Sequence, residues 1–114
     1  MIYLMNSAVM PAGCYGIYRY RPATVDDLRS VLNGDHGRWE SRIGYPQNIE
    51  LIEQWTGVRP PLDRSPSVFK DGDKAIVMRL KYRVVPGAKG APVSDDPRDW
   101  EFAWVEYKEV VPMD

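Results

Sequence analysis

The sequence predicts a single α+β domain in which a mixed β-sheet is flanked by helices. Three observations predict this class. The chain has 114 residues, a common size for one domain. Apolar runs that suit β-strands stand near both ends, and two segments between them carry helical spacing with start and stop signals. Since 44% hydrophobic and 27% charged residues are ordinary for a globular protein, we expect one domain over residues 1–114.

The N-terminal part predicts two strands. Residues 1–10 are dense in apolar residues and stop at a Pro-Ala-Gly turn, which indicates a buried first strand. This run is short, lacks a basic leader and contains Asn6, so we interpret it neither as a signal peptide nor as a membrane span. Residues 17–21 predict a second strand that ends at Pro22, because proline cannot donate an amide hydrogen to a neighbour. Its two arginines share one face.

A first helix is predicted after Thr24. Thr24 and Asp27 have the form of a capping box, and apolar residues follow at helical spacing until Asn33-Gly34 ends the pattern. The next stretch, residues 33–40, is polar and broken by glycine, so it predicts a surface loop. His36 lies in this loop. We interpret it as a solvent-exposed side chain, with a catalytic role as the alternative.

A second helix should begin at Pro46 and end before Gly57, because proline suits the first turn of a helix and glycine its C-terminal end. The N–H groups at the start of a helix have no intrahelical acceptor, and the helix dipole is positive there. Gly44, just before this start, would let a ligand approach the backbone closely. The sequence therefore predicts a position for a phosphate at the N-terminus of this helix.

The second half predicts an irregular segment and two strands. Residues 59–66 contain three prolines, which break both helix and sheet. Residues 69–74 look like a hairpin turn with an Asp-Gly pair at its centre. Residues 75–85 alternate as a strand does. After a long loop over residues 86–98, a final strand at 100–107 should turn Trp100, Phe102 and Trp104 towards the helices.

Three cations are predicted on one face of the strand at residues 75–85, namely Arg79, Lys81 and Arg83. Beside a helix N-terminus, such a face suits a phosphodiester ligand because it combines mobile charges with fixed amide dipoles. The alternative is a solvated face whose cations pair with glutamates of a neighbouring strand. Those glutamates would be Glu101, Glu106 or Glu109.

Charge and cysteine content exclude several classes of function. The formal net charge is −1, from 15 basic and 16 acidic side chains, so the chain lacks the global basic field of a protein that binds duplex nucleic acid. The single cysteine, Cys14, cannot form an internal disulfide, and His36 is the one histidine, so no zinc-binding spacing exists. We therefore expect no metal and no cofactor. A nucleophilic role for Cys14 would need a base partner that the sequence does not display.

Several short motifs, taken in order, are similar to those of one known family. They are Tyr3–Ala8 (YLMNSA), Ser41–Tyr45 (SRIGY), Trp55–Val58 (WTGV), Asp63-Arg64, Asp71–Asp73 (DGD) and Leu80–Val84 (LKYRV). In this order and spacing the chain resembles the viral ring nucleases, small anti-CRISPR proteins that degrade cyclic tetra-adenylate. The resemblance implies a homodimer that holds a ring-shaped nucleotide across its two-fold axis. It also implies a viral protein in the cytoplasm of the infected host cell.

The resemblance further implies a ligand-binding site. Carried over by position, Asn6, Ser7, Gly44 and Arg83 would contact the ligand, and Arg64 would stabilise the neighbouring loop. With the residues at the start of the second helix, the predicted ligand-binding set is Asn6, Ser7, Gly44, Tyr45, Pro46, Gln47, Arg64 and Arg83.

The chain departs from the family at the catalytic position. The family pattern has Ile-Gly-His before the second helix, and this chain has Ile43-Gly44-Tyr45. The family's histidine would protonate the leaving group during attack by a ribose 2′-hydroxyl, so Tyr45 is the candidate catalytic residue by position alone. A glutamate that usually follows the equivalent of Arg83 is also missing, its place falling near Pro86-Gly87. Loss of one general acid typically lowers a rate by about 10² to 10⁴.

We therefore predict a protein that binds and sequesters a cyclic nucleotide signal, such as a cyclic oligoadenylate, without efficient catalysis. The first alternative is an active, metal-independent ring nuclease that uses Tyr45 or His36. The second is a non-catalytic protein-interaction module that docks through residues 59–66. Tyr45 could also indicate a changed ligand, such as another cyclic dinucleotide or an ADP-ribose product, on which its ring would stack.

Overall fold

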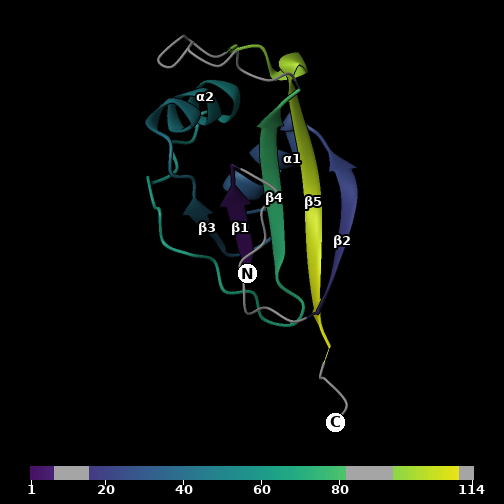
Figure 1. Cartoon of the computed structure of the whole chain (residues 1–114). Helices are drawn as coiled ribbons and strands as arrows, with labels where there is room; N and C mark the ends of the chain where they lie inside the picture. Colours follow the sequence, from purple (N-terminus) through teal and green to yellow (C-terminus); the bar gives the residue numbers. More distant parts are fainter. Residues whose placement is uncertain (7–15, 82–93, 111–114) are drawn as a thin grey trace, which may run out of the picture.

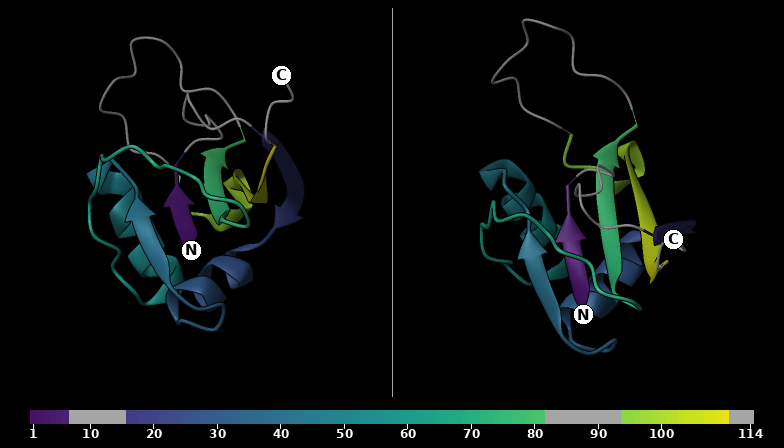
Figure 2. Two further views of the ribbon diagram at one scale, coloured as in Figure 1. Left: turned by 90° about the horizontal axis from the view of Figure 1, so that it is seen from below. Right: turned by 60° about the horizontal axis from the view of Figure 1, so that its bottom comes forward.

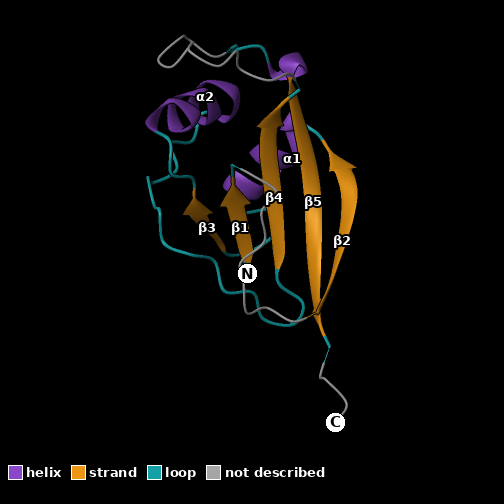
Figure 3. Ribbon diagram, viewed as in Figure 1, coloured by secondary structure: helices purple, strands orange, loops and turns teal. Residues whose placement is uncertain are grey.

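A five-stranded mixed sheet with both helices on one face forms the framework of the computed structural model, which describes residues 1–6, 16–81 and 94–110 (Figures 1 and 3). The elements in chain order are β1 (Ile2–Met5), β2 (Gly16–Ala23), α1 (Val25–Leu32), β3 (Trp39–Arg42), α2 (Pro46–Thr56), β4 (Lys74–Leu80), the 3₁₀ turn η1 (Pro97–Asp99) and β5 (Trp100–Glu109). This confirms the predicted α+β single domain. Neither described helix is long and apolar enough to cross a bilayer.

The strand order is β2-β5-β4-β1-β3. β1 lies between β3 and β4 and is parallel to both, whereas β5 is antiparallel to β4 and to β2 (Figure 2). The carboxyl ends of β1, β3 and β4 therefore meet at one edge of the sheet. We call this the carboxyl edge, and the opposite end of these three strands the amino edge.

The main core lies between the sheet and the two helices. Trp100, Phe102 and Trp104 are buried there, whereas Glu101 is exposed, so β5 alternates as predicted. Trp55 of α2 packs edge-to-face on Trp100 and Phe102, with ring centroids 5.7 and 5.8 Å apart. Aromatic packing thus fixes α2 on the sheet.

A smaller core covers part of the opposite face of the sheet. Phe69 comes from the irregular segment before β4 and packs on Tyr3 at 5.4 Å, with Tyr18 and Tyr107 beside it. β1 is consequently buried on both faces, as expected for a strand with parallel partners on each side.

Local signals place both helices as predicted. Thr24 and Asp27 form the capping box, with Asp27 N donating to Thr24 Oγ1 at 3.2 Å and Thr24 N donating to Asp27 Oδ2 at 2.9 Å. α2 starts at Pro46 and ends at Gly57, whose φ of 80° is left-handed. Arg29 Nη2 of α1 donates to the Trp55 carbonyl of α2 at 2.8 Å, which joins the two helices.

Several predicted boundaries are wrong in the structure. β1 ends at Met5 and does not include Asn6, and residues 7–10 of the predicted strand lie outside the described residues. β2 continues through Pro22, which lies opposite Ala103, because β2 is an edge strand and needs no donor on its outer side. Within the described residues, β4 ends at Leu80.

Two further predictions need correction. β3 begins inside the loop predicted at residues 33–40, because its pairing with β1 makes a strand of residues that lack alternation. The turn at residues 69–74 exists, with Asp73 N donating to Lys70 O at 2.9 Å, yet residues 57–70 form no strand. The turn therefore connects a loop to β4 and is not a hairpin.

Candidate functional site

Three separate parts of the chain meet at the carboxyl edge of the sheet, where β3 leads into α2. Asn6 follows β1, Gly44 and Tyr45 lie between β3 and α2, and Arg64 belongs to the proline-rich segment. In sheets with parallel strands, ligands generally bind in the crevice beyond the carboxyl ends of those strands. We refer to Asn6, Gly44, Tyr45, Gln47 and Arg64 as the carboxyl-edge site.

Hydrogen bonds clamp the backbone of Gly44. Asn6 Oδ1 accepts from Gly44 N at 3.1 Å, and Arg64 Nε donates to the Gly44 carbonyl at 2.9 Å. One residue earlier, the Ile43 carbonyl accepts from Asp63 N at 3.0 Å. The entrance to α2 is thus tied to β1 on one side and to the proline-rich segment on the other.

Gly44 accommodates Arg64 at close range. A Cβ atom at this position would lie 3.0 Å from Arg64 Cγ and 3.7 Å from Arg64 Cδ. The distance of 3.0 Å is shorter than an ordinary van der Waals contact, so a larger residue at position 44 would push the Arg64 side chain aside. The glycine predicted to let a ligand approach the backbone also lets the Arg64 side chain approach it.

The first turn of α2 retains unused hydrogen-bond donors. Tyr45 is the N-cap and its side chain makes no capping bond, Pro46 has no N–H, and the N–H groups of Asn48 and Ile49 both donate to the Tyr45 carbonyl. Within the part of the chain that the structure describes, the N–H groups of Tyr45 and Gln47 have no acceptor. Free peptide donors at the positive end of an 11-residue helix favour an anion.

Electrostatics at the carboxyl edge distinguish Arg64 from Arg42. Arg42 lies 2.8 Å from Glu40 and 3.5 Å from Asp63, so two carboxylates neutralise it. Hydrogen bonds from Ser65 lower the pKa of Asp63, and Arg42 lowers it further, which keeps this carboxyl ionised. Arg64 is exposed and makes no ion pair among the described residues. The first turn of α2 contains no acidic residue.

A shallow apolar pocket of about 300 Å³ adjoins the start of α2. It is lined by Pro46, Ile49, Arg59, Pro60, Pro61 and Leu62. Apolar walls beside a few polar groups are typical of pockets that take a ring-shaped organic ligand. Tyr45, with 54% of its side chain exposed, stands next to this pocket in the sequence and offers a second ring surface.

The structure brings together only part of the predicted site. Asn6, Gly44, Tyr45, Pro46, Gln47 and Arg64 lie at the carboxyl edge, whereas Ser7 and Arg83 lie outside the described residues. Sequence reasoning assigned no role to Arg42 or Asp63. The adjacency of Asp63 to Arg64 was the signal available for Asp63, but its bond to Ile43 is a long-range contact.

Of the three cations predicted on one face of a strand, the structure describes two. Arg79 belongs to the strand, Lys81 follows its end, and Arg83 lies outside the described residues. Arg79 Nε donates to Glu101 Oε2 at 2.7 Å, which confirms for this cation the alternative of cross-strand pairing. Arg79 therefore does not serve as a free cation of the carboxyl-edge site.

His36 lies near the amino edge, before β3, whereas Tyr45 follows the carboxyl end of the same strand. Its Nε2 is 3.2 Å from Ser30 Oγ, and its ring packs on Trp104 with centroids 5.3 Å apart. The exposed side chain that the sequence predicts is confirmed. The structure does not bring His36 and Tyr45 together.

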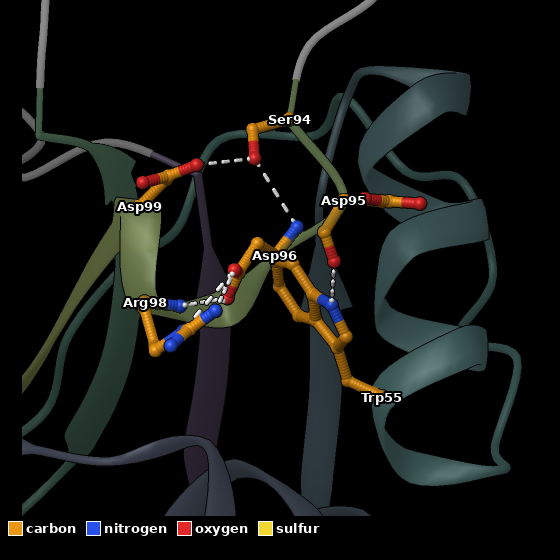
Figure 4. A network of polar contacts seen from close by, with 6 residues as sticks. All are labelled: Trp55, Ser94, Asp95, Asp96, Arg98 and Asp99. Carbon is orange, nitrogen blue, oxygen red and sulfur yellow. Dashed lines mark hydrogen bonds and ion pairs between the residues drawn. The ribbon is translucent and has the colours of Figure 1, made fainter.

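Residues 94–99 are fixed against α2 and β5 (Figure 4). Trp55 Nε1 donates to the Asp95 carbonyl at 2.8 Å, and Trp100 Nε1 donates to the Ser94 carbonyl at 2.9 Å. Ser94 Oγ donates to Asp99 Oδ2 at 2.6 Å. The chain is thereby anchored directly after residues 82–93.

Comparison with known proteins places the chain among viral relatives. It is 24% identical over 88 residues to protein ORF117 of Acidianus two-tailed virus, covering 76% of this chain and 75% of that protein. It is 26% identical over 89 residues to protein 26 of the Hveragerdi isolate of Sulfolobus islandicus filamentous virus, covering 76% and 74%.

A solved structure shares the fold. B116 of Sulfolobus turreted icosahedral virus superposes with a TM-score of 0.68 and 17% sequence identity, covering 91% of this chain and 97% of that chain. The model of the STIV B116-like family matches residues 2–96, a span that includes β1 to β4, both helices and every described residue of the carboxyl-edge site. The chain therefore belongs to the STIV B116-like family, which has members encoded by viruses.

Proposed function

We propose that this protein binds and sequesters a cyclic nucleotide second messenger at the carboxyl-edge site. In this role it is a viral anti-defence protein that removes a host signal from the cytoplasm of the infected cell. A cyclic oligoadenylate is the ligand that the resemblance to the viral ring nucleases implies.

One observation carries the proposal: the N–H groups of Tyr45 and Gln47, which have no acceptor in the described part of the chain, stand at the start of a helix whose entrance is held by Arg64. Arg64 uses Nε on the Gly44 carbonyl, which leaves the outer nitrogens of its guanidinium for a ligand. Asn6 accepts through Oδ1, and its side-chain N–H₂ group has no acceptor among the described residues. Every unused group named here is a donor, and phosphodiester oxygens are acceptors.

Sequestration is favoured over cleavage because the groups at the site position and bind but do not supply a strong acid. Tyr45 stands where the ring nucleases that the chain resembles have their histidine. A phenol is a poorer proton donor at neutral pH than an imidazolium, and the loss of a general acid costs about 10² to 10⁴ in rate. The remaining donors hold the ligand without accelerating attack by its 2′-hydroxyl.

A homodimer completes the proposed site. A cyclic nucleotide with several phosphates is symmetric, and one helix N-terminus with one Arg64 meets only part of its charge. Two copies related by a two-fold axis would present two such sets to one ring. Measurement of the molar mass in solution, with and without ligand, tests this arrangement.

The proposal is tested by retention of ligand. The purified protein is incubated with a panel of cyclic oligonucleotides, freed of unbound ligand and heat-denatured, and the released material is separated by chromatography. Intact ligand in stoichiometric amount is the expected result. Repeated turnover to linear fragments would instead support the ring nuclease alternative, and retention of no member of the panel would contradict the proposal.

Two variants sharpen this test. Arg64→Ala should weaken retention by about tenfold or more, since a hydrogen bond to a charged group is worth about 1.5–3 kcal/mol. Arg38→Ala is the matched control, because Arg38 is an exposed arginine before β3, at the amino edge and away from the carboxyl-edge site. Tyr45→His restores the residue of the ring nuclease pattern and should produce cleavage if that group alone is missing.

Docking of a protein partner through residues 59–66 is the second candidate function. Leu62 lies in this segment with 51% of its side chain exposed, and Val68 follows it with 64% exposed. Exposed apolar side chains are a feature of interaction surfaces when they form one patch. Val68→Ser, which lies outside the lining of the pocket beside α2, should leave ligand retention unchanged. Loss of the anti-defence phenotype in this variant, with retention intact, would favour this candidate.

A further inference from the structure

A second basic region lies on the helix side of the sheet, across β2, β5 and β4. In the strand register, Arg19 and Lys74 both lie opposite Glu106, and Arg21 lies opposite Trp104. Side chains directly opposite each other in antiparallel strands are on the same face. The three cations, Glu106 and Trp104 therefore share one surface, which we call the β2–β5–β4 groove.

The cations of this groove are not neutralised. Arg19, Arg21 and Lys74 are exposed, and none of them takes part in an ion pair within residues 1–6, 16–81 and 94–110. Glu106 is the acidic residue that lines the groove with them, so the local formal charge is positive by two. On the other face of the sheet, Arg79 is held by Glu101 at 2.7 Å.

The groove encloses about 260 Å³ and has a rigid aromatic floor. Trp104 is 5% exposed, and the guanidinium carbon of Arg21 lies 5.4 Å from its ring centroid. The His36 ring packs on the same indole at 5.3 Å. The contact with the indole holds Arg21 in place before a ligand arrives, which reduces the entropy lost on binding.

We propose that the β2–β5–β4 groove binds a diphosphate group, either as free pyrophosphate or as the diphosphate of a nucleotide. Two guanidinium groups can each donate two hydrogen bonds to phosphate oxygens, and Lys74 adds a point charge. Sites for whole drug-sized ligands occupy about 300–1,000 Å³, so a groove of this size fits the charged group rather than an entire nucleotide. This site is separate from the carboxyl-edge site and does not depend on the proposed function.

The test is a titration of the isotope-labelled protein with inorganic pyrophosphate, followed by NMR of the tryptophan indole N–H signals. The signal of Trp104, assigned with Trp104→Phe, should shift in a saturable manner. Orthophosphate at the same ionic strength should shift it at least tenfold more weakly. If orthophosphate and chloride shifted the Trp104 signal as strongly as pyrophosphate does, the proposal would be overturned, because such a result would indicate a general ionic effect.

A pair of double variants with equal charge loss separates specific binding from bulk electrostatics. Arg19→Ala with Lys74→Ala leaves the Arg21–Trp104 contact intact and should weaken pyrophosphate binding at least tenfold. Arg79→Ala with Lys81→Ala removes the same charge from outside the groove and should change the affinity less than twofold. Equal weakening in both would overturn the proposal, and the amide spectra of both proteins verify that they are folded.

Two further measurements identify the ligand and keep the two sites distinguishable. If ADP gives the same Trp104 shift with equal or higher affinity, the ligand is a nucleotide diphosphate; if ADP is excluded, it is free pyrophosphate. Retention of a cyclic nucleotide should be unchanged in the Arg19→Ala, Lys74→Ala protein. Loss of retention together with loss of pyrophosphate binding would show a single shared site and overturn the proposal of a second one.

Discussion

The arginines at the carboxyl edge have polar partners: Arg64 donates to the Gly44 carbonyl, and Arg42 lies between two carboxylates. In the β2–β5–β4 groove, by contrast, Arg19 and Lys74 lie on either side of Glu106 and form no ion pair with it. The first region is built from irregular backbone. Its donors are peptide N–H groups and a positioned guanidinium. The second is built from side chains on three regular strands, where the sheet register alone sets the spacing of the charges.

This difference predicts different sensitivities. A site made of backbone donors fails when the backbone or its immediate support moves, and it responds little to the loss of distant charges. A site made of exposed cations on strands tolerates small backbone changes but depends on charge number and on salt. Substitutions can therefore be chosen that affect one region and leave the other unchanged.

The largest expected effect comes from the aromatic floor that the groove shares with the main core. Trp104→Ala should lower the free energy of unfolding by about 3–5 kcal/mol, because Trp104 is buried and its removal leaves a cavity. Denaturant unfolding measures this. Tyr20→Ala, at a site with 52% exposure, is the control and should change stability by about 0.5 kcal/mol or less. A loss below about 1 kcal/mol for Trp104→Ala would mean that the core closes over the missing ring.

The next effect is specific to the carboxyl edge. Gly44→Ala should weaken retention of the cyclic nucleotide by about tenfold, because the new Cβ would stand 3.0 Å from Arg64 Cγ and displace a charged donor. Pyrophosphate binding in the groove should not change. Gly34→Ala is a suitable control. Gly34 has a φ of 85° and no atom within 4 Å of a Cβ placed there, so the substitution strains the backbone without displacing a side chain of either region. Equal loss of retention in both variants would contradict the role given to Arg64.

The parts of the fold that depend on local sequence signals could be predicted from the sequence. The limits of α2 follow from Pro46 and Gly57, and those of α1 from the Thr24–Asp27 capping box. The alternation in β5 correctly placed Trp100, Phe102 and Trp104 on the helix side. β3 was missed because Trp39–Arg42 becomes a strand only through pairing with β1, a partner more than 30 positions away in the chain.

The candidate sites likewise contain features that local sequence pattern predicts and features that depend on long-range contacts. The start of α2, where we propose that an anion binds, was predictable from Gly44 and Pro46, and the ordered motifs pointed to Asn6 and Arg64. The contacts that join them could not be derived from local pattern, because Asn6 and Arg64 reach Gly44 over 38 and 20 positions. For the groove, the sequence indicated only that Arg19 and Arg21 share a face. Their position relative to Lys74 depends on the insertion of β5 between β2 and β4.

Ligand binding at the two regions should differ moderately in its dependence on salt concentration. Pyrophosphate affinity at the groove should fall by roughly tenfold between about 0.05 and about 0.5 M sodium chloride, because the interacting charges are exposed and become screened. Retention at the carboxyl edge should fall less over the same range, since part of it rests on peptide hydrogen bonds. Parallel titrations at several salt concentrations measure both. An equal salt dependence would indicate that both regions bind mainly through long-range charge.

The smallest effect concerns Asp63, which supports the carboxyl edge from the side. Hydrogen bonds from Ser65, and then the charge of Arg42, lower the pKa of Asp63 below the ordinary value of 3.8, so the unfolded chain takes up a proton at this carboxyl more readily than the folded chain does. The stabilisation is therefore fully present above about pH 5 and is lost as the pH falls through the lowered pKa. Asp63→Asn should be slightly less stable than the parent protein at pH 7, and the difference in stability should shrink as the pH falls through the lowered pKa of Asp63. A difference that does not shrink would mean that Asp63 acts through the geometry of its side-chain hydrogen bond from Ser65 N rather than through its charge.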